Sequence, residues 1–109
     1  GAITENAVTL TGTSTTIDIS VATNFVHDLT GATTYTFSNP ASTGNASSFT
    51  LKIIQDSTAR AITWPSTVDW AGGTAPTLTS TNNGVDVFTF YTIDGGTIYY
   101  GFTAGQAMA

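Results

Sequence analysis

The chain contains one histidine, His27, which is its first candidate for acid–base or metal chemistry. A histidine near neutral pH can act as a general base, a metal ligand or a pH switch. His27 shares one face of an alternating segment with Phe25 and Leu29. A buried or interface histidine with a hydrogen-bond partner is therefore favoured over a catalytic one.

Seven carboxylates are the other groups that could do chemistry. A glycosidase needs two carboxylates about 5 to 10 Å apart in a cleft, and a calcium loop needs regularly spaced oxygen ligands. The sequence offers no local pair and no D-x-D-x-D-G pattern. Asp94 belongs to a turn and Asp69 to a loop, while Asp86 lies in an apolar stretch, where we expect it to cap backbone amides or to pair with Arg60 or Lys52. We predict no catalytic residue, no metal and no cofactor. The remaining carboxylates are Glu5, Asp18, Asp28 and Asp56.

Aromatic side chains are the candidates for binding. An amphipathic ring can stack on a sugar, although packing in a core or a subunit interface is the favoured interpretation. Trp70 is the leading ligand candidate because it lies in a glycine-rich segment, where exposed binding residues concentrate. Tyr91 and Tyr99 are further candidates for contact with a ligand or partner. The other rings considered are Trp64, Tyr35 and Tyr100.

The stretch 85–103 is the element around which these residues are organised. Two runs of β-branched and aromatic residues flank Asp94-Gly95-Gly96, which predicts a β-hairpin whose turn uses the positive φ angles of glycine. The first run is apolar on both faces, so we expect both faces to be covered. Phe88 and Phe90 point to one side. The other side carries Val85, Val87, Tyr91 and Ile93.

Strand signals recur every 8 to 12 residues or so along the rest of the chain, and no segment shows a sustained helical period. The sequence predicts an all-β fold, an antiparallel β-sandwich of jelly-roll type with about seven or eight strands. One domain over residues 1–109 is expected, with residues 1–13 as an edge strand or an arm, and no internal repeat is apparent. The expected inward-facing set is Ile17, Ile19, Phe25, Leu29, Phe37, Phe49, Leu51, Ile53, Val87, Phe88, Phe90 and Tyr100.

Composition excludes several classes of function. Charged residues form 8% of the 109 residues, and the net charge is −5. Lys52 and Arg60 are the only two cations, too few to neutralise a nucleic-acid backbone or to hold an anionic membrane. The chain has no cysteine and no apolar run long enough to span a membrane. Because it begins with Gly1 rather than methionine, we expect a processed protein or a piece of a longer chain.

Three short motifs in the second half carry a resemblance to a known family. These are Trp64-Pro65, the W-x-G-G-T-x-P pattern of residues 70–76, and the Asp94-Gly-Gly turn before Tyr99-Tyr-Gly. Together they resemble a module of tailed-bacteriophage virion proteins, often found at the C-terminal end of tail-fibre-like or appendage chains. Residues 9–14 and 32–40 fit the same pattern. The resemblance implies a β-rich, trimeric virion component on the particle surface, without catalytic residues.

Three functions are compatible with the sequence. The first is a tail-fibre or appendage module, and the second is a capsid decoration (cement) protein that stabilises the head. The third is a carbohydrate-binding module that recognises a host-surface glycan. The expected partners are copies of the chain and other virion proteins. We expect the trimer interface to include Val85, Val87, Tyr91 and Ile93, with Tyr91 and Tyr99 opposite one another across the hairpin.

Overall fold

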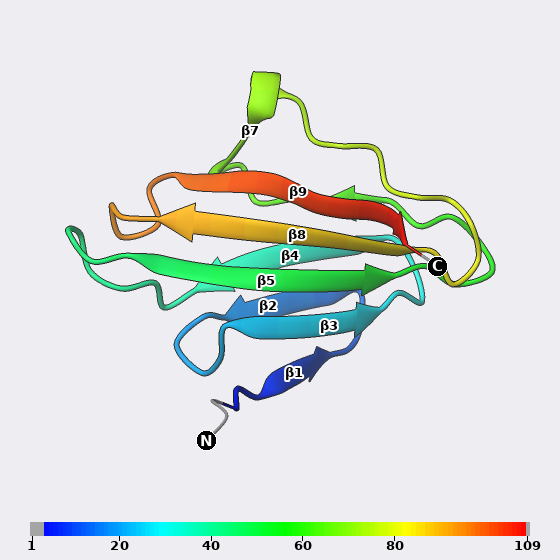
Figure 1. Cartoon of the computed structure of the whole chain (residues 1–109), viewed down its shortest axis with the longest axis horizontal. Coiled ribbons are helices and arrows are strands. Elements are labelled where there is room, and N and C mark those ends of the chain that lie inside the picture. Colours follow the sequence, from blue (N-terminus) through cyan, green and yellow to red (C-terminus); the bar gives the residue numbers. More distant parts are fainter. Residues whose placement is uncertain (1–3, 109) are drawn as a thin grey trace.

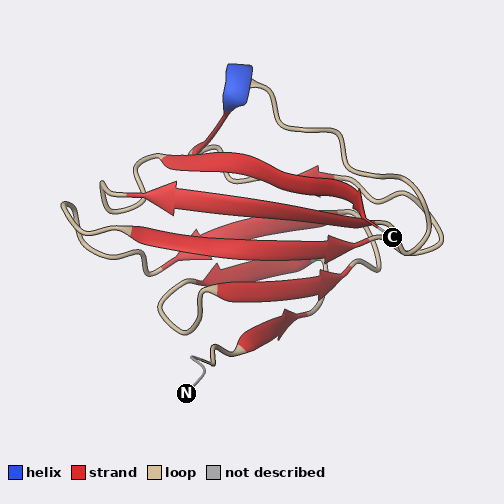
Figure 2. Cartoon of the chain, in the orientation of Figure 1, coloured by secondary structure: helices blue, strands red, loops and turns tan. Residues whose placement is uncertain are grey.

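The computed structural model describes residues 4–108 and consists almost entirely of β-strands (Figures 1 and 2). One 3-10 turn, η1 (Ala71–Gly73), is the only helical element of the described residues. The all-β prediction is therefore confirmed. The strands are β1 (Ala7–Leu10), β2 (Ser14–Asp18), β3 (Asn24–Asp28), β4 (Thr33–Ser38), β5 (Ser47–Ile54), β6 (Ile62–Thr63), β7 (Val68–Trp70), β8 (Val85–Thr92) and β9 (Tyr99–Met108).

The strands form two sheets that lie one behind the other (Figure 1). Sheet A has the order β1-β3-β5-β8-β9-β7, and sheet B has the order β2-β4-β6. From β1 to β6 the chain alternates between the sheets, and within each sheet successive strands pair in parallel. The first six strands thus form three stacked coils, a connectivity of the β-solenoid kind. The hairpin β8–β9 then continues sheet A beyond β5.

The prediction of antiparallel pairing throughout, which a jelly roll requires, is wrong. Five of the seven strand pairs are parallel, and only β5–β8 and β8–β9 are antiparallel. The alternation of side chains shows which residues face the core, but it is the same for both strand directions. One tripeptide recurs at equivalent places in the coils: Leu-Thr-Gly precedes β2 at residues 10–12 and β4 at residues 29–31. The first 13 residues include the edge strand β1, and residues 1–3 lie outside the described part.

The parallel pairing of β2 with β4 predicts opposite outcomes for proline at two adjacent positions. The N–H of Thr34 donates to the carbonyl of Thr13 (2.9 Å) and the N–H of Ile19 to that of Ser38 (3.0 Å). Backbone groups of alternate residues point to opposite sides of a strand, so Thr15 bonds to β4 and Thr16 directs its N–H to the free edge. Thr15→Pro should lower the free energy of unfolding by about 2 to 3 kcal/mol. Thr16→Pro should change it by less than about 1 kcal/mol.

Urea unfolding followed by circular dichroism measures both variants. Equal losses for the two prolines would contradict the register of β2 against β4.

The core is a cluster of aromatic side chains between the sheets. Phe37 of β4 packs edge-on against Phe49 and Phe90 of sheet A, with ring centroids 5.0 and 5.1 Å apart. Of the expected inward set, Ile19 and Phe37 are half-buried against this core, and Val87 and Tyr100 are on the outer face of sheet A, where they were not expected. The members that are buried as predicted are Ile17, Phe25, Leu29, Phe49, Leu51, Ile53, Phe88 and Phe90.

The hairpin between β8 and β9 is confirmed, with a longer turn than predicted. Residues 93–98 connect the strands, and Gly95 and Gly96 adopt φ angles of +70° and +83°. The carboxylate of Asp94 accepts hydrogen bonds from the N–H of Ile98 (3.1 Å) and the hydroxyl of Thr92 (3.0 Å). The bond from Ile98 is the main cause that lowers the pKa of Asp94. This carboxylate therefore organises the turn, as its position suggested.

Candidate functional site

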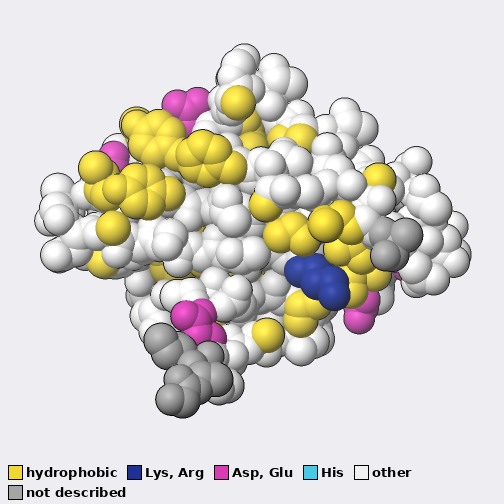
Figure 3. All heavy atoms as spheres, in the orientation of Figure 1, with side chains coloured by type: hydrophobic (Ala, Val, Ile, Leu, Met, Phe, Trp, Pro, Cys, Tyr) yellow, Lys and Arg dark blue, Asp and Glu magenta, His cyan; other side chains and the backbone are white. Residues whose placement is uncertain are grey.

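The outer face of sheet A carries a group of exposed apolar side chains at the hairpin end of β8 and β9. We call it the aromatic face and define it by Tyr91, Tyr100, Phe102, Ile93 and Ile98. Tyr91 lies directly opposite Tyr100, and Thr89 lies opposite Phe102, so the three rings are cross-strand or diagonal neighbours. Tyr91, Tyr100 and Phe102 are 39%, 42% and 54% exposed. Figure 3 shows hydrophobic atoms gathered over this part of the sheet.

The same outer face continues along β8 toward its first residue. Val85 and Val87 point outward and are half-buried, since they alternate with the buried Asp86 and Phe88. Val87 lies opposite Lys52 of β5, which is exposed. Thr89 lies between these valines and the aromatic face, so the two apolar groups share one face of the sheet but are separate.

The expected interface residues Val85, Val87 and Tyr91 therefore share one face, and Ile93 follows β8 directly with 47% exposure. The expected pairing of Tyr91 with Tyr99 is wrong. Tyr99 faces the core and is 3% exposed, while Tyr100 is the cross-strand neighbour of Tyr91. A turn one residue longer or shorter reverses the faces of the returning strand, and sequence spacing did not determine that length.

Trp70 is in the core rather than exposed in a loop, so the expectation of an exposed position is wrong. It ends the short strand β7 and is 8% exposed. Its ring packs against Trp64 and Phe88, with centroids 5.2 and 5.8 Å away. A Cβ at Gly101 would lie 2.8 Å from the Trp70 ring, so the glycine of β9 makes room for it. This packing leaves little of the ring for a ligand.

His27 is fully buried and hydrogen-bonded, as expected for a structural histidine. Its Nδ1 lies 2.7 Å from the hydroxyl of Tyr35, and the two rings meet edge-on across the sheets. Its Nε2 has no hydrogen-bond partner among the described residues. Burial lowers the pKa of His27, so the side chain is neutral at physiological pH. A buried group without solvent access is not a candidate base for a substrate.

The neutral state of His27 predicts that stability falls in mild acid. Below the ordinary histidine pKa of about 6.5, the unfolded chain takes up a proton that the folded chain does not. The free energy of unfolding should therefore fall by up to about 1.4 kcal/mol per pH unit as the pH decreases below about 6.5, until the lowered pKa of the folded state is reached. Urea midpoints from pH 7.5 down to about 5 measure the slope.

His27→Gln is the control, because the chain has no other histidine. The pKa values of Asp18, Asp56 and Asp94 are lowered, so protonation of these carboxylates changes the free energy of unfolding only at a more acidic pH. An unchanged slope in the variant would contradict the assignment.

Asp86 is buried and fully engaged by hydrogen bonds. Its carboxylate accepts from the N–H of Thr79 (2.7 Å), the N–H of Ala107 (3.1 Å) and the hydroxyl of Thr79. It thereby joins the segment before β8 to the end of β9. The expected role in capping backbone amides is confirmed. The alternative of an ion pair with Arg60 or Lys52 is not observed, since Arg60 pairs with Asp56 at 3.1 Å and Lys52 is exposed on the outer face of sheet A.

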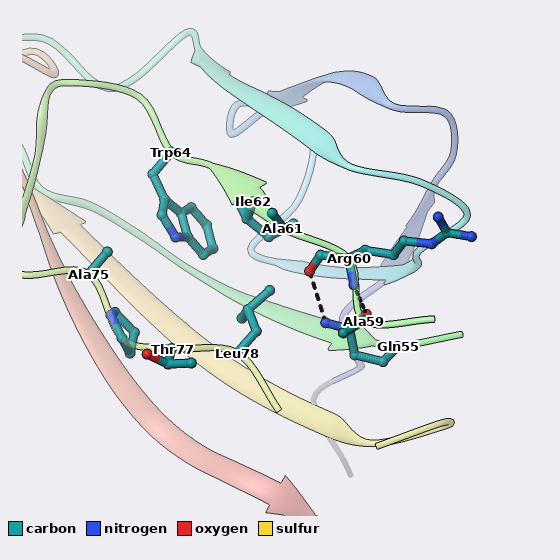
Figure 4. Close-up of a pocket in the computed structure, with 10 residues that line it drawn as sticks. Gln55, Ala59, Arg60, Ala61, Ile62, Trp64, Ala75, Thr77 and Leu78 are labelled. Atoms are coloured by element: carbon teal, nitrogen blue, oxygen red, sulfur yellow. Dashed lines mark hydrogen bonds between the residues drawn. The ribbon is translucent and has the colours of Figure 1, made fainter. Parts of the chain in front are cut away.

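A hollow of about 350 Å³ lies between β6 and residues 75–78 (Figure 4). Trp64 and Leu78 point into it, and the guanidinium of Arg60 extends away from it. The side chain of Gln55 bonds to both the N–H (3.0 Å) and the carbonyl (3.1 Å) of Arg60. The polar groups at this hollow are thus occupied by one another, and the rest of its lining is mostly apolar.

No group of three or more metal-binding side chains occurs within residues 4–108. In the same part of the chain no helix has the length and apolar character needed to cross a membrane. Comparison with known proteins gives no match, whether with family models, curated proteins or solved structures.

Proposed function

We propose that this chain is a non-enzymatic structural module of a bacteriophage particle, a two-sheet β-sandwich of the tail-fibre or appendage type. In this proposal it lies on the particle surface and works as a homotrimer, joined to other virion proteins. The aromatic face is the single observation that carries the proposal, and the motifs of residues 64–76 and 94–101 support its viral character.

The aromatic face has the features of a subunit interface. Large aromatic side chains with few rotatable bonds supply contact area at low entropic cost. Contiguous exposed apolar patches usually mark an interface, and this chain has few charges to keep such a patch soluble. Sheet B covers the inner side of sheet A, so the outer side remains for a partner. A stable contact buries about 800 Å² on each partner, which requires Val85 and Val87 in addition to the aromatic face.

Light scattering on the purified chain at micromolar concentration tests the assembly. We expect the mass of three chains for the wild type and of one chain for Tyr91→Asp, because the new carboxylate would be buried beside Tyr100 of the same face. Val21→Asp is the matched control: Val21 is 62% exposed and lies outside the aromatic face, so this variant should keep the wild-type mass.

A single-chain mass for the wild type would overturn the trimer.

Electron microscopy of labelled particles tests the location. Label on the head rather than on the tail would replace the appendage assignment with that of a capsid decoration protein.

A further inference from the structure

A second hollow, of about 410 Å³, opens at the hairpin-turn end of the molecule, and no side chain of the aromatic face lines it. It lies between the end of β4, residues 65–67 and the turn at Gly95 and Gly96. This volume falls within the usual range of small-molecule sites, about 300 to 1,000 Å³. Aromatic rings and neutral polar groups line it and no charged side chain does, notably Tyr35, Phe37, Tyr99, Asn39, Ser66 and Thr67.

The hydroxyl of Tyr99 is an unused hydrogen-bonding group in this hollow. Tyr99 is only 3% exposed, yet its hydroxyl forms no hydrogen bond with another described residue. The oxygen of this hydroxyl also keeps some accessible surface. Within residues 4–108, His27 Nε2 is the only side-chain nitrogen or oxygen that is both fully buried and without a partner. The hydroxyl of Tyr35, by contrast, is occupied by His27.

The turn above Tyr99 holds this hydroxyl in place. A Cβ at residue 96 would lie 2.7 Å from the Tyr99 oxygen and 3.0 Å from Pro40, so only glycine allows this close approach. Burial, and next the charge of Asp94, raise the pKa of Tyr99. The phenol therefore stays protonated and can donate a hydrogen bond to a ligand.

We propose that this hollow binds an uncharged saccharide unit. The ring carbons of a sugar can pack on the half-buried Phe37, Pro40 and Pro65, and its hydroxyls pair with neutral hydroxyl and amide groups of the kind found at the rim. Tyr99 would donate to a sugar oxygen, with Asn39 and Thr67 at the rim beside it. The two cations, Lys52 and Arg60, lie outside the lining, which disfavours acidic sugars and phosphates. The proposal does not depend on the trimer, because no residue of the aromatic face lines the hollow.

Ligand-observed and amide NMR test the binding of neutral monosaccharides and disaccharides of glucose, galactose, mannose and N-acetylglucosamine, with glucuronate as the charged comparison. Sugar at about 10 mM detects dissociation constants in the millimolar range. We expect shifts at Thr67, Gly95 and Gly96. Tyr99→Phe, which removes only the oxygen, should weaken binding about 10-fold or more with little change in melting temperature.

Tyr91→Phe is the matched control, since it removes the same atom from the aromatic face and should bind as the wild type does. Thr67→Val repeats the test if Tyr99→Phe is poorly folded. The proposal is overturned if no neutral sugar shifts these amides, if both variants at the hollow bind like the wild type, or if the shifts fall on the aromatic face. Light scattering decides the trimer separately, so failure of one proposal is distinguishable from failure of the other.

Discussion

Phe90→Ala is expected to lower the free energy of unfolding by about 3 to 5 kcal/mol, the usual range for truncating a buried phenylalanine. Phe90 is 1% exposed and lies between the sheets. Its ring stacks on Phe49 (5.0 Å) and meets Trp64 and Trp70 at 5.5 Å. Alanine would leave a cavity that these large, mutually packed rings cannot easily fill, so the loss should lie toward the upper part of that range.

Phe102→Ala is the matched control on the neighbouring strand. Phe102 is 54% exposed, so its truncation should cost less than about 1 kcal/mol in the isolated fold. Both changes are best made in a Tyr91→Asp background, where self-association does not add to the measured stability. Urea unfolding measures the free energies. Equal losses at Phe90 and Phe102 would contradict the assignment of inner and outer faces in sheet A.

The faces of the strands followed from sequence wherever side chains alternate cleanly. Phe49, Leu51 and Ile53 are buried on one face of β5, as their period of two predicts. The same rule makes Val87 and Phe88 incompatible as two inward residues, because adjacent side chains of a strand point to opposite sides. The error at Val87 came from treating an apolar residue as inward by its type rather than by its position.

Strand direction did not follow from sequence, because it depends on how segments connect in space. A tight Asp-Gly-Gly turn predicts an antiparallel neighbour, and β8 and β9 bear this out. Elsewhere the turns after Leu10 and Leu29 lead into the opposite sheet, so each strand meets a partner from the coil before it. The repeated Leu-Thr-Gly was the available signal for this stacking, but two copies of a tripeptide are weak evidence of a repeat.

The candidate site was predictable in part for the same reasons. The surplus of apolar residues along β8 indicated an outward face that includes Tyr91. Tyr100 was placed inward and Phe102 was not among the candidates, because their face depends on the exact length of the turn at residues 93–98. Trp70 was misplaced because a glycine-rich neighbourhood suggests exposure, whereas the glycine that matters for Trp70 is the distant Gly101.

Asp86 lies where no local pattern explains a carboxylate, and only the tertiary structure supplies its partners. It occupies an inward position of β8 and is 2% exposed. Its donors come from Thr79, seven residues earlier, and from the far end of β9, where Gln106 also approaches at 3.5 Å. Ala107 adopts an unusual φ of +52°, and its N–H is directed at this carboxylate. The side chain thus fixes an irregular backbone that two separate segments share.

Asp86→Ala is expected to destabilise the fold by about 3 kcal/mol, because it removes a buried carboxylate and leaves the half-buried N–H of Thr79 without its charged acceptor. The exposed N–H of Ala107 keeps the hydroxyl of Thr79 as an acceptor (3.0 Å). Asp86→Asn should recover only part of this loss. Its amide NH2 group replaces one of the two accepting oxygens, and this group donates hydrogen bonds where the backbone N–H groups need an acceptor. Asp56→Ala is the control: it removes a partly exposed carboxylate paired with Arg60 and should cost less than about 1 kcal/mol. Urea unfolding measures the losses, and amide hydrogen exchange should accelerate first at residues 79 and 107. Unchanged exchange at these two amides in Asp86→Ala would show that Asp86 does not hold the two segments together.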